Sequence, residues 1–221
     1  MAAAPLVVGF DFDMTLADTR PGISAVWQAL SAETGVPIDV AAVVARLGPP
    51  LALEAANWFP PEQVDDAVTR YRGLYPAMAI PATELLPGVR EAIDAVHGMG
   101  GSVLVVTAKT ELHARLHVEQ LRLPVDDVIG DVWAEQKGVV LRERGASIYV
   151  GDHLGDVRGA RAAGAVSVSV TTGPISAEEF RAANTDVVLT DLREFPAWLD
   201  QHLLAAGGAP ATSGLPSGSG R

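Results

Sequence analysis

The chain has 221 residues, is 48% hydrophobic and carries a formal net charge of −11. This acidic balance, without any basic run, argues against a nucleic-acid backbone or an anionic membrane as the main partner. The absence of cysteine excludes disulfides, thiolate catalysis and zinc–thiolate sites, and no stretch reaches the roughly 20 apolar residues of a membrane span. Because the N-terminus also lacks the basic residues of a signal peptide, we expect a cytoplasmic globular protein.

The predicted elements begin with a short, β-branched apolar run at residues 6–10, which indicates a buried strand. Residues 19–83 then show helical patterns and no convincing strand. One such pattern has the i, i+3, i+4, i+7 spacing and consists of Ile23, Val26, Trp27 and Leu30. The expected helices are 21–35, 39–48, 50–59 and 61–75. We interpret this region as a small helical bundle inserted after the first strand, with the proline-containing segment 76–88 as its return linker.

After the insert, apolar strand-like runs alternate with helical segments. The expected strands are 102–107, 128–132, 147–152, 166–171 and 186–190. The expected helices are 87–100, 110–121, 137–145, 155–164 and 176–184. In the second of these helices Leu112, Leu116 and Leu121 predict the buried side, and the i, i+4 spacing of His113 and His117 is interpreted as chance. The alternation predicts an α/β fold with a Rossmann-like, doubly wound parallel sheet.

These patterns divide the chain into three parts. Residues 1–18 and 84–204 are expected to form the α/β core domain, and residues 19–83 the inserted helical domain. The segment 205–221 is rich in Gly, Ser, Pro and Ala, and it carries too little apolar surface to offset the entropy of ordering it. We therefore expect this C-terminal tail to be disordered.

Polar residues follow several of the predicted strands at the point where each strand ends. Together with one lysine at a helix start, they are Asp11, Asp13, Thr107, Lys137, Asp152 and Asp156. Open α/β sheets bind ligands outside the carboxyl ends of their strands, so these groups would converge on one rim. Clustered carboxylates repel one another unless a cation is present, and Mg²⁺ accepts carboxylate oxygens together with phosphate oxygens. The pattern therefore predicts a phosphoryl group held between a metal ion and a lysine.

The motifs "DFDMT", "VVT", Lys137 and "GDHLGD" resemble the four ordered motifs of the haloacid dehalogenase-like (HAD) hydrolases. The resemblance spans residues 6–200, and the most similar branch is the phosphoglycolate-phosphatase-like group with a small helical cap. It implies that Asp11 is the nucleophile, forming an aspartyl-phosphate, and that Asp13 is the general acid and then the general base. An aspartate at this second position favours a phosphatase or a phosphomutase over a dehalogenase.

The resemblance also implies binding roles. Thr107, Ala108 and Lys137 would contact the transferring phosphoryl group. Asp152, Asp156 or both would hold Mg²⁺, together with Asp11 and the backbone carbonyl of Asp13. The sequence departs from the family pattern at three positions: Met14 stands where glycine is commonest, Ala108 replaces the usual asparagine, and Gly138 stands where proline commonly follows the lysine. Lys109 resembles the basic residue that the family carries next.

Each assignment has a simpler alternative. Asp152 and Asp156 precede or begin a predicted helix, where aspartate is favoured as a cap or in the first turn. Thr107 alone would be a strand-end hydroxyl, Lys137 alone a solvated lysine, and His153 either a pocket-edge or a surface residue. In the helical cap we select Arg46 as the candidate specificity residue.

The leading hypothesis is a Mg²⁺-dependent phosphoric monoester hydrolase that acts on a small phosphorylated metabolite, as a monomer or a homodimer. A sugar phosphomutase of the same superfamily is the first alternative. A phospho-accepting receiver-type signalling module is an alternative from another class, although receivers carry their aspartate in mid-chain and lack a helical insertion. A catalytically inactive binding protein is disfavoured because all motif positions are filled.

Overall fold

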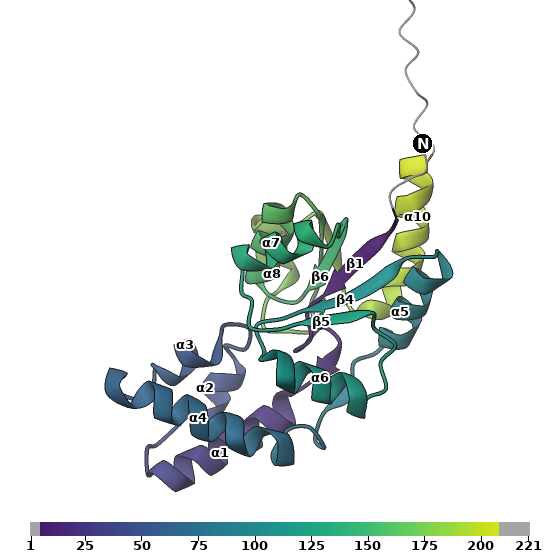
Figure 1. The fold of residues 1–221 in the computed structure, drawn as a ribbon. Coiled ribbons are helices and arrows are strands. Elements are labelled where there is room, and N and C mark those ends of the chain that lie inside the picture. The colour runs from purple at the N-terminus through teal and green to yellow at the C-terminus, as the bar shows by residue number, and fades with distance from the viewer. Residues whose placement is uncertain (1–4, 208–221) are drawn as a thin grey trace, which may run out of the picture.

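The computed structural model describes residues 5–207, and its central element is a six-stranded parallel sheet (Figure 1). The strands lie in the order β5 (Asp127–Ile129), β4 (Ser102–Val106), β1 (Val7–Phe10), β6 (Ile148–Gly151), β7 (Val166–Val170) and β8 (Val187–Leu189). The chain runs outward from β1 to β4 and β5, and then returns to β6 on the other side of β1. This order confirms the predicted doubly wound α/β fold, and it places the topological switch point at β1.

Helices cover both faces of the sheet. On one face α5 (Val89–Gly98) and α10 (Phe195–Gly207) lie over β1 and β4, and on the other lie α7 (Glu135–Glu143) and α8 (Leu154–Ala163) (Figure 1). Alternate residues of β4 serve the two faces, since Val103 and Val105 join the first cluster while Leu104 and Val106 join the second. The sequence analysis did not predict α10, although Phe195 and Leu199 are fully buried. The remaining helices beside the sheet are α6 (Glu111–Gln120), α9 (Ala177–Ala182) and the short 3₁₀ helix Leu192–Glu194.

Four helices between the first strand and the rest of the sheet form a second body, and we call them the cap helices. They are α1 (Arg20–Thr34), α2 (Val40–Val44), α3 (Leu51–Ala55) and α4 (Pro61–Met78). They pack around a hydrophobic cluster of their own, which includes Trp27, Leu30 and Tyr71. A two-stranded antiparallel ribbon, β2 (Ala17–Asp18) with β3 (Glu84–Leu85), connects them to the core. The boundaries of a separate cap domain at residues 19 and 83 stay a prediction.

Two local expectations were wrong. The expected linker 76–88 begins inside α4, because the helix continues through Pro76 to Met78. In α6 the side chain of Leu112 is 67% exposed, whereas His113 and His117 are buried. The reason is that α6 lies between the sheet and α4, so its two histidines face Phe12 and Tyr75 while Leu112 faces outward. The histidine spacing therefore has a structural basis.

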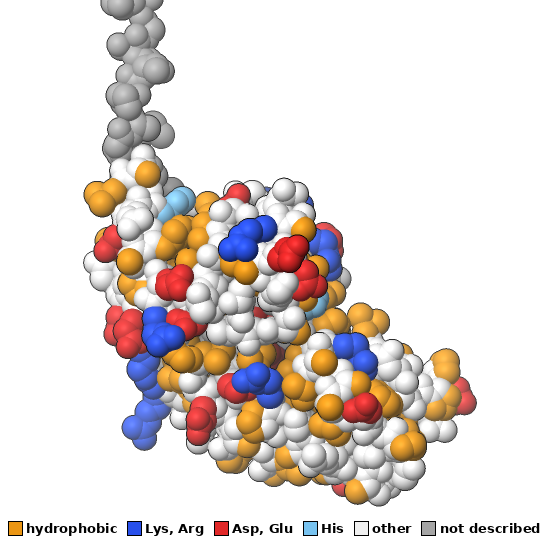
Figure 2. Space-filling view, turned by 180° about the vertical axis from the view of Figure 1, so that it is seen from behind, with side chains coloured by type: hydrophobic (Ala, Val, Ile, Leu, Met, Phe, Trp, Pro, Cys, Tyr) orange, Lys and Arg blue, Asp and Glu red, His pale blue; other side chains and the backbone are white. Residues whose placement is uncertain are grey.

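Acidic and basic side chains are interspersed over the face shown in Figure 2, and hydrophobic side chains are most frequent over the lobe that the cap helices form. Among the described residues, no helix is both long enough and apolar enough to cross a membrane. The predicted disordered tail lies outside the described residues beyond position 207, and residues 205–207 end α10.

Candidate active site

The chain leaves β1 in a tight turn that brings Asp11 and Asp13 to the same rim. The amide of Asp11 still donates to the Val150 carbonyl at 2.8 Å, so Asp11 extends the sheet by one residue. The chain then folds back, and the amide of Met14 donates to the Ala17 carbonyl at 2.8 Å. Met14 has a φ of 56°, in the left-handed region that glycine adopts without strain. This geometry explains why the resembled motif usually has glycine at the position of Met14.

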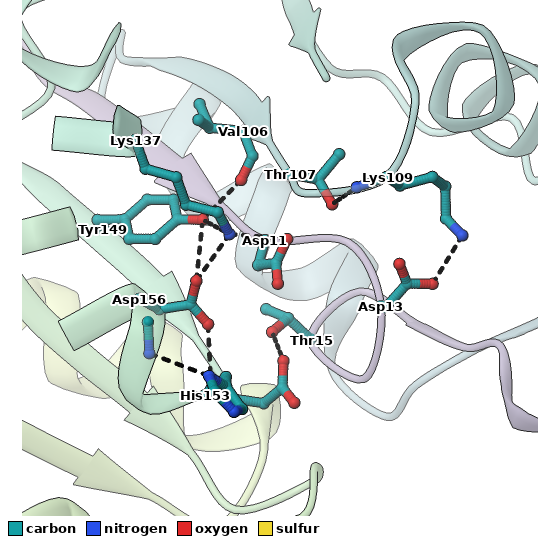
Figure 3. Close-up of polar contacts among 12 residues, drawn as sticks. Asp11, Asp13, Thr15, Val106, Thr107, Lys109, Lys137, Tyr149, His153 and Asp156 are labelled. Atoms are coloured by element: carbon teal, nitrogen blue, oxygen red, sulfur yellow. Dashed lines mark hydrogen bonds and ion pairs between the residues drawn. The ribbon is translucent and has the colours of Figure 1, made fainter. Parts of the chain in front are cut away.

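Lys137 is fully buried and lies at the centre of the polar contacts in Figure 3. Its Nζ lies 3.2 Å from Asp11 Oδ1 and 2.7 Å from Asp156 Oδ1, and it donates to the Tyr149 hydroxyl at 2.8 Å. That hydroxyl donates in turn to the Val106 carbonyl at 2.6 Å. Lys137 lies in the first turn of α7, which begins at Glu135, two residues before the expected helix start at Lys137. Its burial rules out the solvated alternative.

Tyr149 is a contributor that the sequence analysis missed. It lies in β6 with its ring on the α7 and α8 face, where its hydroxyl fixes the Lys137 ammonium group. A single tyrosine within the otherwise apolar run 148–151 was the available signal, because a buried tyrosine hydroxyl normally has a partner.

Three buried carboxylates lie close together beside this lysine, and two of them, Asp11 and Asp156, contact it. Asp11, Asp152 and Asp156 each offer an oxygen atom, and these atoms lie within 4.8 Å of one another. Asp152 Oδ1 accepts a hydrogen bond from the Thr15 hydroxyl at 2.9 Å. Asp156 Oδ2 accepts from the His153 amide at 3.0 Å and completes a capping box at the start of α8. Asp156 therefore caps a helix and belongs to the cluster at once, so the two alternatives for this residue are compatible.

The cluster holds more negative charge than its single lysine can balance. Burial raises the pKa of Asp11 to about 6, because the opposing effect of Lys137 is partly offset by the neighbouring carboxylates Asp156 and Asp13. Burial and the same kind of repulsion raise the pKa of Asp152 well above its ordinary value. Burial alone would lower the pKa of Lys137, but Asp11 and Asp156 more than offset it, so its pKa is raised.

A divalent cation fits this donor set. The buried Oδ1 of Asp11 has no hydrogen-bond partner of good geometry among residues 5–207, although the Lys137 ammonium lies 3.2 Å away. An oxygen-rich site with surplus negative charge is the environment that hard divalent ions prefer. The backbone also makes room for the carboxylates. A Cβ atom at Gly151 would overlap the Asp156 carboxylate, and one at Gly173 would overlap that of Asp152.

Asp13 faces a different set of partners. Its Oδ1 accepts from the Thr19 hydroxyl at 2.6 Å and lies 3.0 Å from Lys109 Nζ. Burial alone would raise the pKa of Asp13, but Lys109 and Thr19 more than compensate, and the pKa is lowered. Lys109 also donates to the Tyr75 hydroxyl of α4 at 2.6 Å, which ties the cap helices to the rim. The resemblance pointed to Lys109 as the family's basic residue, but its contacts with Asp13 and Tyr75 were not predicted.

The other predicted residues divide into two groups. Thr107 is buried at the end of β4, and it lies with Lys109 and Asp13 on the side of Asp11 away from Lys137 (Figure 3). Ala108 lines a cavity of about 220 Å³ that opens between this rim and the cap helices. Arg46 lines the same cavity from the cap side, so it belongs to the cavity and not to the carboxylate cluster.

Sequence comparisons match the chain to known hydrolases and phosphatases. Residues 8–170 match the sequence model of the haloacid dehalogenase-like hydrolase family. The chain is 31% identical to a phosphoglycolate phosphatase of Pseudomonas syringae, over 89% of this chain and 80% of that protein. It is 29% identical to the probable phosphatase IndB of Dickeya dadantii, over 86% and 91%.

Solved structures show the same fold. A haloacid dehalogenase-like hydrolase from Streptococcus pneumoniae superimposes with a TM-score of 0.79 at 24% identity, over 88% of this chain and 98% of that one. The family match and the curated relatives together confirm the resemblance drawn from the motifs. The chain belongs to the haloacid dehalogenase-like hydrolases, in the branch similar to phosphoglycolate phosphatases.

Proposed function

We propose that the chain is a Mg²⁺-dependent phosphoric monoester hydrolase that acts on a small phosphorylated metabolite through a phosphorylated Asp11. The observation that carries the proposal is the carboxylate of Asp11 at the switch point: its Oδ1 has no hydrogen-bond partner of good geometry among residues 5–207, and Lys137 lies 3.2 Å away. Membership of a hydrolase family and similarity to proteins named phosphatases support the same reaction class.

In the first step, an oxygen of Asp11 attacks phosphorus and the bond to the leaving alcohol breaks. Phosphoryl transfer depends mainly on positioning and on charge neutralisation at the transferring group. The Lys137 ammonium lies beside Asp11 for that purpose, and the Tyr149 hydroxyl holds it there. The Thr107 hydroxyl lies on the other side of Asp11, where it would donate to a phosphoryl oxygen.

Asp13 would exchange protons in both steps. It donates a proton to the leaving oxygen and then accepts one from the water that hydrolyses the aspartyl-phosphate. Lys109 and Thr19 favour its ionised form, which suits the second step. A dianionic phosphate near Lys109 would weaken this effect, so Asp13 is expected to take up its proton when the substrate binds.

Asp11, Asp152 and Asp156 would hold Mg²⁺, with the backbone carbonyl of Asp13 as a further ligand. When bound, the ion would neutralise phosphoryl oxygens and shield the attacking carboxylate from its neighbours. Thr15 keeps Asp152 oriented through the 2.9 Å hydrogen bond, and Gly151 and Gly173 leave the two carboxylates the space they occupy.

The direct test is phosphate release from p-nitrophenyl phosphate and a set of small phosphomonoesters, with and without Mg²⁺. Asp11→Asn is expected to lower kcat by about 10⁴-fold or more, because the amide is not a nucleophile. Asp191→Asn is the matched control, since this buried carboxylate lies outside the cluster and pairs with Arg193. Activity that survives Asp11→Asn, or that is independent of Mg²⁺, contradicts the proposal.

A further inference from the structure

The residues that line the cavity beside Asp13 indicate which leaving groups it can accommodate. Resting on the proposed phosphatase function, we propose that this cavity selects phosphomonoesters whose leaving alcohol is uncharged and carries a ring-sized apolar group, and that it disfavours leaving groups with a carboxylate. The relatives named phosphoglycolate phosphatases act, by their names, on an ester with a carboxylate. The preference proposed for this chain is the opposite one.

The walls of the cavity are mainly apolar and aromatic. Trp27, Tyr71 and Leu51 face it from the cap helices, and Trp133 faces it from the core. The rings of Trp27 and Tyr71 lie 5.0 Å apart and form one continuous apolar wall. Such surfaces gain free energy when they bury an apolar or aromatic group.

The size of the cavity agrees with a single ring. Its volume is about 220 Å³. An apolar cavity of about 150 Å³ already accommodates benzene. A two-carbon acid would leave much of this volume to water, whereas a benzyl group would fill most of it.

The basic residues of the cavity are all paired. Arg46 forms a bidentate pair with Glu54, at 2.6 and 3.2 Å, and Glu54 is held in place by the Trp58 indole at 2.8 Å. Arg72 of α4 lies 3.7 Å from Asp131 of the core. The third basic residue is Lys109, which pairs with Asp13.

The charges of the lining side chains therefore balance. Arg46, Arg72 and Lys109 carry three positive charges against three carboxylates, those of Asp13, Glu54 and Asp131. The remaining titratable ring is His113, and burial next to Lys109 and Arg72 lowers its pKa to about 4, so it is neutral near pH 7. A carboxylate on the leaving group would lose water and gain no free counter-charge. Arg46, our candidate specificity residue, is thus paired with Glu54 and does not offer a free positive charge to a substrate.

Three benzyl esters test the inference: benzyl phosphate, 4-carbamoylbenzyl phosphate and 4-carboxybenzyl phosphate. The last two have nearly the same shape and differ in charge, so their kcat/KM ratio isolates the effect of the carboxylate. We expect the parent enzyme to prefer the amide by at least about tenfold, and to prefer benzyl phosphate over phosphoglycolate.

Glu54→Gln sharpens the test, because it removes the charge that neutralises Arg46 and keeps a hydrogen-bond acceptor for Trp58. The amide-to-carboxylate ratio should fall by about tenfold. Asp131→Asn, which frees Arg72 at a more exposed position, is the second variant and should lower the ratio in the same direction. Asp66→Asn is the matched control: it breaks an equally short cap-helix pair with Arg70, at 2.7 Å and outside the cavity. It should leave the ratio unchanged.

The outcomes separate the two proposals. If no ester releases phosphate in an Asp11-dependent reaction, the phosphatase function fails and the selectivity fails with it. If p-nitrophenyl phosphate is hydrolysed through Asp11 but the carboxylate esters are used as well as the amide, or phosphoglycolate is used best, only the selectivity is overturned. A ratio that moves equally in Asp66→Asn and Glu54→Gln also overturns it.

Discussion

The rim of the sheet adjoins the cavity under the cap helices, but the two regions differ in how their charges are balanced. At the rim, the three carboxylates of Asp11, Asp152 and Asp156 lie together beside one lysine. Burial, with a smaller effect of the neighbouring carboxylates, raises the pKa of Asp11. In the cavity, each basic side chain has its own carboxylate within 4 Å. The comparison indicates that the rim is arranged for partners that bring charge, a metal ion and a phosphate, and the cavity for a partner that brings none.

At the rim, Lys137→Met should have the largest effect on stability. It leaves the carboxylates of Asp11 and Asp156 buried without a counter-charge, so we expect a loss of about 3–5 kcal/mol in the free energy of unfolding. Excess Mg²⁺ should restore part of this stability, because the ion binds the folded state. Urea unfolding with and without Mg²⁺ measures both effects.

Arg144→Met is the control for Lys137→Met. Arg144 pairs with Asp127 at 2.6 Å near the end of α7, but the Arg144 side chain is exposed to solvent and Asp127 is only half-buried. Its removal should cost less than about 1 kcal/mol. Equal losses for the two variants would contradict the role given to burial.

Asp152→Asn tests the metal site itself. The change keeps the size of the side chain and removes one charge from the cluster, so Mg²⁺ affinity should fall by about 100-fold, more than for an outer contact. Thr15→Val removes only the hydrogen bond that orients Asp152 and should cost about tenfold. Isothermal titration with Mg²⁺ measures both, and an unchanged affinity in Asp152→Asn would remove this residue from the site.

Tyr75→Phe tests the connection between the two regions. Its hydroxyl accepts from Lys109 at 2.6 Å and lies 3.1 Å from His117 Nε2. Loss of both contacts should lower the free energy of unfolding by about 1–2 kcal/mol and lower kcat more than it changes KM. Tyr71→Phe is the control for stability on the same helix, because the contacts to Lys109 and His117 are made by the Tyr75 hydroxyl.

The buried histidine of α6 should give the smallest effect near pH 7, because its contribution is a pH dependence of stability that develops only at acid pH. Burial and the nearby Lys109 lower the pKa of His117 to about 3. The unfolded chain binds a proton near pH 6.5 and the folded chain does not, so stability falls as the pH drops from about 6.5 towards 3.

Each such group contributes up to about 1.4 kcal/mol per pH unit. His117→Gln should therefore flatten the acid side of the stability curve, as measured by urea unfolding at several pH values. His97→Gln, at a half-buried position on α5, is the comparison variant. A slope unchanged in His117→Gln would show that this ring is not held neutral.

The sequence predicted the six sheet strands because buried parallel strands are continuous apolar runs that depend little on their neighbours. It predicted the converging residues because parallel strands share one carboxyl edge. On α6 the expectation failed at Leu112, although Leu116 and Leu121 do pack against the hydrophobic clusters. Only the position of α4 decides that His117 is inside and Leu112 outside. The missed helix α10 is similar, because Phe195 becomes a core residue only through packing on Phe10, far away in the chain.

Contacts between residues far apart in the chain also could not be predicted from the sequence. Thr15 and Asp152 are 137 positions apart, and neither residue type alone indicates the hydrogen bond between them. The Arg46–Glu54 pair depends on how the segment between α2 and α3 folds, so Arg46 could be placed in the cap but not recognised as neutralised. For Met14 the sequence showed that glycine is replaced, and the structure adds the physical reason, because Met14 has a left-handed φ that glycine adopts without strain.

The most direct measurement is the site of phosphorylation. Asp13→Asn should slow hydrolysis of the phosphoenzyme, while p-nitrophenyl phosphate, whose leaving group needs no proton, still transfers its phosphoryl group. After acid quenching, mass spectrometry of the peptides should find one added PO₃ unit on Asp11 in this variant and none in Asp11→Asn. A phosphoryl group on another residue, or turnover in which no phosphoenzyme forms on Asp11, would contradict the account.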